Sequence, residues 1–360
     1  MIATHGGNIK QISEDYQIPE GLLLDFSANI NPLGVSDIVK KAITEQFDSV
    51  QHYPDLRYKA LKQTIATHHT CQSHHIFLGN GAADVIYSLP RVLSTTKMLV
   101  LAPTFSEYED AFSVYDVDVV YFETAYTGFN VKMDDLINCI QTECVDTVCV
   151  CNPNNPTGTL IEPSEMNKLV NYCKKEQIHL IVDEAFMDFL PKSQSIDGLI
   201  TDYANLYIIR SLTKIFAIPG IRLGYLLTSN QKVIDSLEKQ APPWRINCFA
   251  ELAGRLSLTD DSQLLASIAF IQQEREYLMK QLSRFQSLKV IESSGNYLFF
   301  EYLDEGNLQE LLLEHSILIR DCSNYKGLTG KYFRVAVRTH EENKRLITGL
   351  EETLNGDSDR

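Results

Sequence analysis

The sequence lacks several features that mark membrane-bound, secreted or disordered proteins. It shows no apolar run of transmembrane length, no secretory signal peptide and no low-complexity tract. Positive charge is also scarce, because 32 Lys and Arg residues stand against 47 Asp and Glu residues, a net charge of −15. Such an acidic chain is repelled by nucleic acid and by anionic membranes, so we expect neither as a partner. We expect a cytoplasmic protein.

The eight cysteines do not form a C-x-x-C pair, and two of them lie in one apolar stretch, TVCVC. Scattered cysteines of this kind argue against a disulfide framework, so we expect reduced and mostly buried thiols. They are Cys71, Cys139, Cys144, Cys149, Cys151, Cys173, Cys248 and Cys322.

The segment HHTCQSHH at residues 68–75 packs four histidines and one cysteine into eight residues. A metal site is one interpretation. The segment falls between an expected helix and the strand before Gly79, where a surface connection belongs, and nothing fixes the geometry of its side chains. We therefore favour a surface loop and predict no metal.

With 360 residues and 44% hydrophobic content, the chain can form a sizeable core. Strand and helix patterns alternate from residue 51 to residue 240, as in a mainly parallel sheet with helices on both faces. The sequence PPW at 242–244 breaks this pattern. We predict an amino-terminal arm at 1–50 that joins a small lobe, a large lobe at 51–240, and the small lobe itself at 241–360, with a helical stretch at about 257–285.

The most informative stretch is RSLTKIFAIPGIRLGY at residues 210–225, which follows a short β-branched run. That run predicts a buried strand, so Lys214 lies just beyond a strand's carboxyl end, where open α/β sheets bind ligands. Ser211 precedes Lys214 by three residues and Arg222 follows it by eight, so a hydroxyl and a guanidinium could share one phosphate. An isolated lysine here would more often be a solvated loop residue, but its companions favour an aldehyde cofactor that carries a phosphate.

Two further strands end in polar residues. Asp183 closes the apolar run HLIVD, and its carboxylate could pair with a pyridine nitrogen or simply cap the next helix. The run TVCVC at 147–151 leads into NPNNPTG at 152–158, whose Pro and Gly residues predict a turn.

The sequence GNGAADVIYSL at 79–89 predicts a Gly-rich turn that opens a helix, and a helix amino end can bind phosphate. We expect the backbone N–H groups of Gly81, Ala82 and Ala83 to be the donors. A dinucleotide fingerprint is rejected because its sixth position is Asp84, not Gly or Ala.

These elements, in their order and spacing, resemble the pyridoxal phosphate site of fold-type I enzymes, the class I and II aminotransferase superfamily, over about residues 29–338. The resemblance implies an α/β fold with a mainly parallel, seven-stranded sheet in the large lobe and a smaller α+β lobe. It implies that Lys214 binds the cofactor aldehyde and, with Asp183, is catalytic. It also implies that Asn155 contacts the cofactor's phenolic oxygen and that Phe105 stacks on its ring, although Phe105 alone could equally be a core residue.

Short motifs indicate which members of this superfamily the chain resembles most. HGGN at 5–8, DFSANINPLG at 25–34, YPD at 53–55 and AIPG at 217–220 look like threonine-phosphate decarboxylases of cobalamin biosynthesis. The related histidinol-phosphate aminotransferases usually lack the HGGN start and usually carry Tyr where this chain has Phe186.

By the same resemblance, Arg334 would hold the substrate carboxylate, and His5, Arg320 and Asn31 would contact the substrate phosphate or its neighbourhood. His5 could instead be an ordinary terminal residue. Tyr53 would reach the cofactor phosphate of the neighbouring subunit in a homodimer, although a core tyrosine is the simpler alternative.

Three functions follow from these residues. The favoured one is a lyase that decarboxylates O-phospho-L-threonine, or a similar phosphorylated amino acid, to an aminoalkyl phosphate. The second is an aminotransferase of the histidinol-phosphate type that uses glutamate and 2-oxoglutarate. The third is a non-catalytic binding protein, which the intact Lys214, Asp183, Asn155 and Arg222 argue against.

Overall fold

The computed structural model describes residues 6–355 and contains one large sheet flanked by helices. The large sheet has seven strands, and its strand β8 runs antiparallel to both of its neighbours while the other pairs are parallel. The expected seven-stranded, mainly parallel sheet is therefore confirmed. In spatial order the strands are β2 (Ile76–Gly79), β8 (Gly224–Leu227), β7 (Leu206–Ser211), β6 (His179–Asp183), β5 (Thr147–Cys151), β3 (Lys97–Ala102) and β4 (Asp118–Glu123).

Both faces of this sheet are buried, because successive side chains of a strand point to opposite faces. In β5, Val148 and Val150 join one core while Cys149 and Cys151 join the other. Helices α4 (Ala82–Ser88), α5 (Glu107–Ser113) and α9 (Gln231–Gln240) cover the cysteine side. Helices α3 (Lys59–His69), α6 (Met133–Glu143), α7 (Pro163–Lys175) and α10 (Cys248–Ser257) cover the valine side.

All eight cysteines are free, as expected. Burial is less general than predicted, since four of them are buried and Cys144 is exposed.

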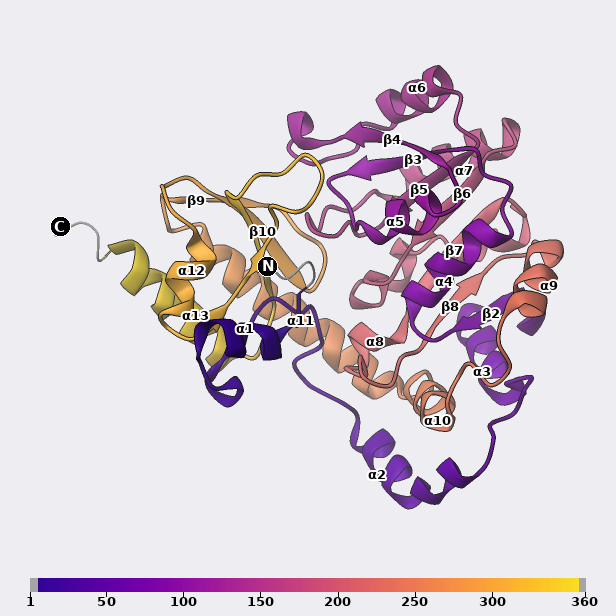
Figure 1. The fold of residues 1–360 in the computed structure, drawn as a ribbon, viewed down its shortest axis with the longest axis horizontal. Coiled ribbons are helices and arrows are strands. Elements are labelled where there is room, and N and C mark those ends of the chain that lie inside the picture. The colour runs from indigo at the N-terminus through magenta and orange to yellow at the C-terminus, as the bar shows by residue number, and fades with distance from the viewer. Residues whose placement is uncertain (1–5, 356–360) are drawn as a thin grey trace.

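A second, four-stranded sheet is antiparallel throughout, in the order β12 (Arg320–Asp321), β13 (Tyr332–Ala336), β10 (Tyr297–Tyr302) and β9 (Leu288–Ile291). It packs with α11 (Asp261–Leu282), α12 (Leu308–Leu313) and α13 (His340–Asn355) (Figure 1). The helical stretch expected at about 257–285 is confirmed as α11, which follows the end of α10 at Ser257. Asp260 accepts a hydrogen bond from the backbone N–H of Gln263 and is the amino-terminal cap of α11.

The first part of the amino-terminal segment lies against this smaller sheet. Helix α1 (Ile9–Tyr16) contributes Ile12 to an apolar cluster with Leu318, and β1 (Leu24–Asp25) pairs in parallel with β11 (Ile317–Leu318). Helix α2 (Asp37–Glu45) then contacts α10. Figure 1 shows this indigo segment running from the smaller sheet, past the bottom of the view, to α3.

The parallel strands end at one edge of the large sheet, which gathers their following residues there. Strand β7 leads directly into the short helix α8 (Leu212–Ile215), and β6 ends at Asp183. Short 3-10 helices complete the described chain: η1 (Glu20–Leu22), η2 (Phe47–Gln51), η3 (Ser73–His75), η4 (Leu89–Arg91), η5 (Ala125–Thr127), η6 (Met187–Phe189), η7 (Lys192–Gln194) and η8 (Asp197–Thr201). Within residues 6–355, no helix combines the length and apolar character needed to cross a bilayer.

Candidate active site

A cavity of about 260 Å³ lies at the carboxyl edge of the large sheet, between that sheet and the smaller one. Most of the side chains singled out from the sequence line it. They are Ala82, Ala83, Phe105, Asn155, Asp183, Ser211, Lys214, Arg222 and Arg334.

Lys214 lies on α8, one turn beyond the end of β7, and faces this cavity. Burial lowers its pKa to about 8, and the positive charges of Arg334 and Arg222 act in the same direction, whereas Asp183 opposes them. An ordinary lysine has a pKa of roughly 10.4, so a much larger share of Lys214 carries the neutral, nucleophilic amine near neutral pH.

Asp183 is fixed by two donors at the end of β6. The Tyr108 hydroxyl donates to its Oδ2 at 2.6 Å, and the backbone N–H of Ala185 donates to its Oδ1 at 2.9 Å. Burial raises the pKa of Asp183, while both hydrogen bonds and the charge of Lys214 favour the ionised form. The result is an oriented carboxyl group that lines the cavity.

Other residues that line the cavity offer donors for an anion. The Ser211 and Thr213 hydroxyls lie 2.8 Å apart, and both residues line the cavity. Arg222 adopts a left-handed backbone with φ of 65°, and its Nη1 donates to the carbonyl of Pro219 at 3.0 Å, which orients the guanidinium. The Arg222 guanidinium lies so close to Gly81 that a Cβ at position 81 would collide with the guanidinium.

The structure does not support the expected role of the Gly81 N–H as an anion donor. Its N–H already donates to the carbonyl of Gly79 at 2.8 Å, so it is not an available anion donor. Gly81 instead provides space, with φ of 91°, and the following Ala82 and Ala83 line the cavity at the start of α4.

These donors fit pyridoxal phosphate. The hydroxyls and guanidinium suit a phosphate, the buried Asp183 suits a ring nitrogen, and Lys214 between them suits an aldehyde. Phe105 supplies an aromatic wall, with its ring edge-on to that of Tyr108 at 5.8 Å between centroids. The phosphate, the ring nitrogen, the aldehyde and the ring face of the cofactor therefore each have a partner of matching chemistry.

Several lining residues were not selected from the sequence. Asn29 is buried, and its Oδ1 finds no hydrogen-bond donor among the described residues. Thr213 and Tyr325 also line the cavity. Their place in the sequence could have identified two of them. Asn29 belongs to the DFSANINPLG motif, and Thr213 lies between Ser211 and Lys214.

The expectation that Asn31 contacts the substrate is not met. Its Nδ2 donates to the Ile215 carbonyl at 2.7 Å and to the Ser267 hydroxyl at 2.8 Å, and its Oδ1 accepts from the backbone of Leu33. With its amide used in this way, Asn31 ties the amino-terminal segment to α8 and α11. His5 lies outside the described residues.

Arg320 and Tyr53 do not line this cavity. Arg320 lines a neighbouring pocket that shares Gly6 and Ser27 with the first, and it is directly opposite Arg334 across the β12–β13 pair. Tyr53 is 80% exposed and stacks on Trp244, with ring centroids 4.4 Å apart, so it is not a core tyrosine.

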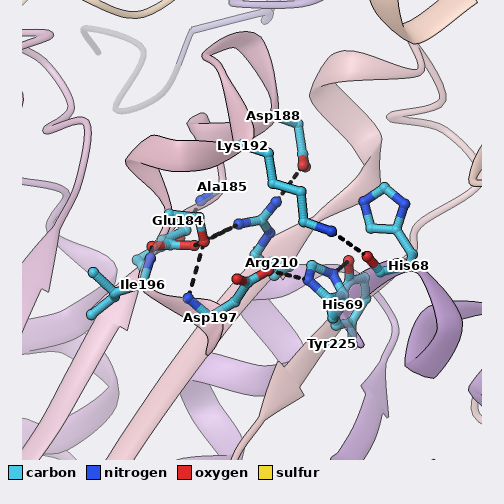
Figure 2. Close-up of polar contacts among 12 residues, drawn as sticks. His68, His69, Glu184, Ala185, Asp188, Lys192, Ile196, Asp197, Arg210 and Tyr225 are labelled. Atoms are coloured by element: carbon cyan, nitrogen blue, oxygen red, sulfur yellow. Dashed lines mark hydrogen bonds and ion pairs between the residues drawn. The ribbon is translucent and has the colours of Figure 1, made fainter. Parts of the chain in front are cut away.

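Behind the cavity, a buried ionic cluster joins the ends of β6 and β7. Figure 2 shows the Arg210 guanidinium between two carboxylates, with Glu184 at 2.5 Å and Asp188 on the other side. Ser195 adds a hydrogen bond to Glu184 at 2.6 Å. Since Glu184 follows Asp183 and Arg210 precedes Ser211, this cluster fixes the backbone on which two cavity residues stand.

The surface loop expected at 68–75 is not fully exposed, because two of its histidines are buried. His69 is buried, and its ring nitrogens contact Asp197 Oδ2 at 2.5 Å and the Tyr225 hydroxyl at 2.7 Å (Figure 2). Burial lowers the pKa of His69 to about 4, so it is neutral at physiological pH. His75 is buried too. In the part of the chain that the structure describes, no three His, Cys, Asp or Glu side chains are placed to hold a metal ion.

Comparison with known proteins gives one consistent family. The profile of the family "Aminotransferase class I and II" matches residues 23–350. The chain is 35% identical to threonine-phosphate decarboxylase of Salmonella typhimurium over 355 residues, 98% of this chain and 97% of that protein.

Two solved structures share the fold over nearly their whole length. Histidinol-phosphate aminotransferase from Clostridium acetobutylicum superposes with a TM-score of 0.87 at 32% identity, covering 93% of this chain and 100% of that one. L-threonine-O-3-phosphate decarboxylase from Porphyromonas gingivalis superposes with a TM-score of 0.83 at 25% identity, covering 92% and 99%. By sequence, fold and cavity, the chain belongs to the class I and II aminotransferase family.

Proposed function

We propose that this protein binds pyridoxal phosphate and decarboxylates O-phospho-L-threonine, or a similar phosphorylated amino acid, to an aminoalkyl phosphate. The observation that carries this proposal is the near full-length identity of 35% to a threonine-phosphate decarboxylase, in a chain whose cavity presents the complete donor set described above. The same donor set argues against a non-catalytic binding protein.

Each side chain has a role that its geometry supports. Lys214 would bind the cofactor aldehyde and later deliver a proton to Cα of the substrate, because burial lowers the pKa of its amine to about 8. Asp183, held by Tyr108, would keep a proton on the ring nitrogen. When bound, pyridoxal phosphate supplies the electron sink for the electron pair that remains as carbon dioxide leaves. Phe105 would cover the ring, and Ser211 with Arg222 would hold the phosphate.

Arg334 supports an anionic substrate. It is buried, and its guanidinium donates to two neutral oxygens, Oδ1 of Asn155 and the Ser27 carbonyl. No described carboxylate forms an ion pair with it. A buried guanidinium without a counter-ion favours an incoming anion, so we assign Arg334 to the substrate carboxylate.

Arg320 gives the site a second cation close to the first. It is buried and faces Arg334 across two adjacent strands, at the wall between the two pockets. Two guanidinium groups at opposite positions of adjacent strands can bind two anionic groups of one ligand. A substrate with both a carboxylate and a phosphate fits this pair.

An aminotransferase of the histidinol-phosphate type is the alternative, favoured by the structural similarity at 32% identity. Steady-state kinetics distinguish the two. We expect kcat/KM for O-phospho-L-threonine to exceed that for histidinol phosphate with 2-oxoglutarate, and L-threonine without the phosphate to be a poor substrate. Efficient turnover of histidinol phosphate, with no turnover of phosphothreonine, would contradict the decarboxylase and support the aminotransferase.

We also propose a cytoplasmic homodimer. Of the large apolar side chains described as exposed, six lie within residues 33–56: Leu33, Ile38, Phe47, Val50, Tyr53 and Leu56. Apolar side chains that gather on one surface favour burial by a partner, and a second copy of the chain is the simplest one. Tyr53 would then reach the cofactor phosphate of the partner subunit. Eight free cysteines suit a reducing compartment.

The division into an arm at 1–50, a large lobe at 51–240 and a small lobe at 241–360 remains our proposal. The pairing of β1 with β11 supports the union of the arm with the small lobe. Limited proteolysis that cleaves first near residues 240–247 would agree with it, whereas first cleavage within the seven-stranded sheet would not.

A further inference from the structure

Phe186 and Tyr325 both line the cavity that contains Lys214, but only Tyr325 brings a hydroxyl to it. Phe186 packs edge-on against the ring of Tyr297, with centroids 5.0 Å apart. Tyr325 is buried, and its hydroxyl donates to Oδ1 of Asn155 at 3.2 Å. The phenolic hydroxyl next to Asn155 therefore comes from the loop after β12 and not from the segment after β6.

Asn155 receives a second hydrogen bond on the same atom, from Nη1 of Arg334. An amide oxygen has two lone pairs, so Tyr325 and Arg334 together use its accepting capacity. This determines which end of the Asn155 amide is the oxygen and leaves Nδ2 as the end that can donate into the cavity. None of the described residues accepts a hydrogen bond from Nδ2.

We propose that Tyr325 is a positioning residue: its hydroxyl holds the Asn155 amide so that Nδ2 donates to the phenolic oxygen of pyridoxal phosphate. The inference rests on the cofactor site proposed above. Asn155 lies in the turn after β5 of the large sheet, while Tyr325 belongs to the smaller sheet's connection, so the contact also sets how the two parts meet at the cofactor. The Arg320 guanidinium lies over the Tyr325 ring, 5.5 Å from its centroid.

The test uses the holoenzyme of Tyr325→Phe, which removes one oxygen atom. We expect the dissociation constant for pyridoxal phosphate to rise roughly 3- to 10-fold, as for loss of one hydrogen bond. A donor on the phenolic oxygen withdraws electron density from the linkage to Lys214, so weakening it makes that nitrogen more basic. The pH midpoint of the bound cofactor's absorbance should therefore move upward.

Other charges at this nitrogen do not change in the variant. Those that face Lys214 are Asp183, Arg222 and Arg334, and all three are retained. Tyr325→Met, which also lacks the hydroxyl, should move the midpoint in the same direction and provides a second variant if Tyr325→Phe does not fold.

Tyr297→Phe is the matched control. It removes another buried hydroxyl, which donates at 2.7 Å to the backbone carbonyl of the neighbouring Asn154. We expect lower thermal stability and an unchanged midpoint. A midpoint shift in this control equal to that of Tyr325→Phe would show a general packing effect and overturn the proposal.

A double-mutant cycle tests whether Tyr325 acts through Asn155. Asn155→Ala should shift the midpoint further than Tyr325→Phe, and adding Tyr325→Phe to it should change nothing more. Additive shifts, or an unchanged midpoint in both Tyr325 variants, would contradict the proposal. Failure of the unmodified protein to bind pyridoxal phosphate would instead overturn the proposed function.

Discussion

The Tyr108 hydroxyl donates to Asp183 Oδ2 at 2.6 Å, and Tyr108 is the side-chain donor that fixes this carboxylate. A hydrogen bond to a charged group is worth about 1.5–3 kcal/mol, because the lost partner leaves a buried charge undersatisfied.

Tyr108→Phe should therefore lower kcat roughly tenfold, and Asp183→Ala should lower it further. Tyr87→Phe serves as the control, because its hydroxyl binds Glu107 at 2.7 Å and the residue does not line the cavity. Unchanged turnover in both the Tyr108 and Asp183 variants would contradict the role of this pair.

Lys214→Ala should abolish turnover together with the absorbance of the lysine-bound cofactor. In the unmodified apoprotein, the rate of cofactor capture should rise with pH and level off above about 8, since the neutral amine is the nucleophile and burial has lowered its pKa to about 8. Stopped-flow absorbance measures this rate. A rate that continues to climb towards pH 10 would indicate an ordinary, solvated lysine.

Arg334→Gln removes the cation assigned to the substrate carboxylate. We expect kcat/KM for O-phospho-L-threonine to fall on the order of 100-fold, as for loss of a buried, charge-assisted pair. Arg338→Gln is the matched control, since Arg338 pairs with Glu342 at 2.6 Å and does not line the cavity. It should stay within about twofold of the unmodified protein.

Mixed dimers test the role of Tyr53. Tyr53→Ala and Lys214→Ala homodimers should each have little activity, because every site lacks one essential group. Coexpression puts both lesions into one site of each mixed dimer and leaves the other intact, so about one quarter of full activity should return. No recovery would place Tyr53 in its own chain's site, and a fully active Tyr53→Ala homodimer would place it outside any site.

Arg210→Met tests the buried cluster behind the cavity. It leaves Glu184 and Asp188 without their cation, so the free energy of unfolding should fall by about 3–5 kcal/mol. Lys175→Met breaks an exposed pair with Glu176 and should leave the free energy of unfolding nearly unchanged. Urea unfolding followed by circular dichroism measures both. Equal stability of the two variants would contradict the importance of this cluster.

Residues at strand ends could be predicted from sequence because the strand pattern itself places them. Asp183, Ser211 and Lys214 follow apolar runs whose carboxyl ends meet at one edge of the sheet. Asn29 and Asn31 show where prediction from the sequence fails. The segment that carries them is neither strand nor helix, so periodicity cannot tell which asparagine faces the cavity.

Side-chain contacts between residues far apart in the sequence could not be predicted for a similar reason. Tyr325 meets Asn155 from 170 residues away, through a loop without periodic pattern. His69 is buried only because η8 brings Asp197 and β8 brings Tyr225 to it. Nothing in the local sequence encodes these encounters.

The most direct test supplies the pyridoxal phosphate-loaded protein with O-phospho-L-threonine alone, without any keto acid, and follows carbon dioxide and 1-aminopropan-2-yl phosphate. We predict many equivalents of both products per Lys214 site. A single conversion of the cofactor to its amine form, with further turnover only after 2-oxoglutarate is added, would contradict the decarboxylase.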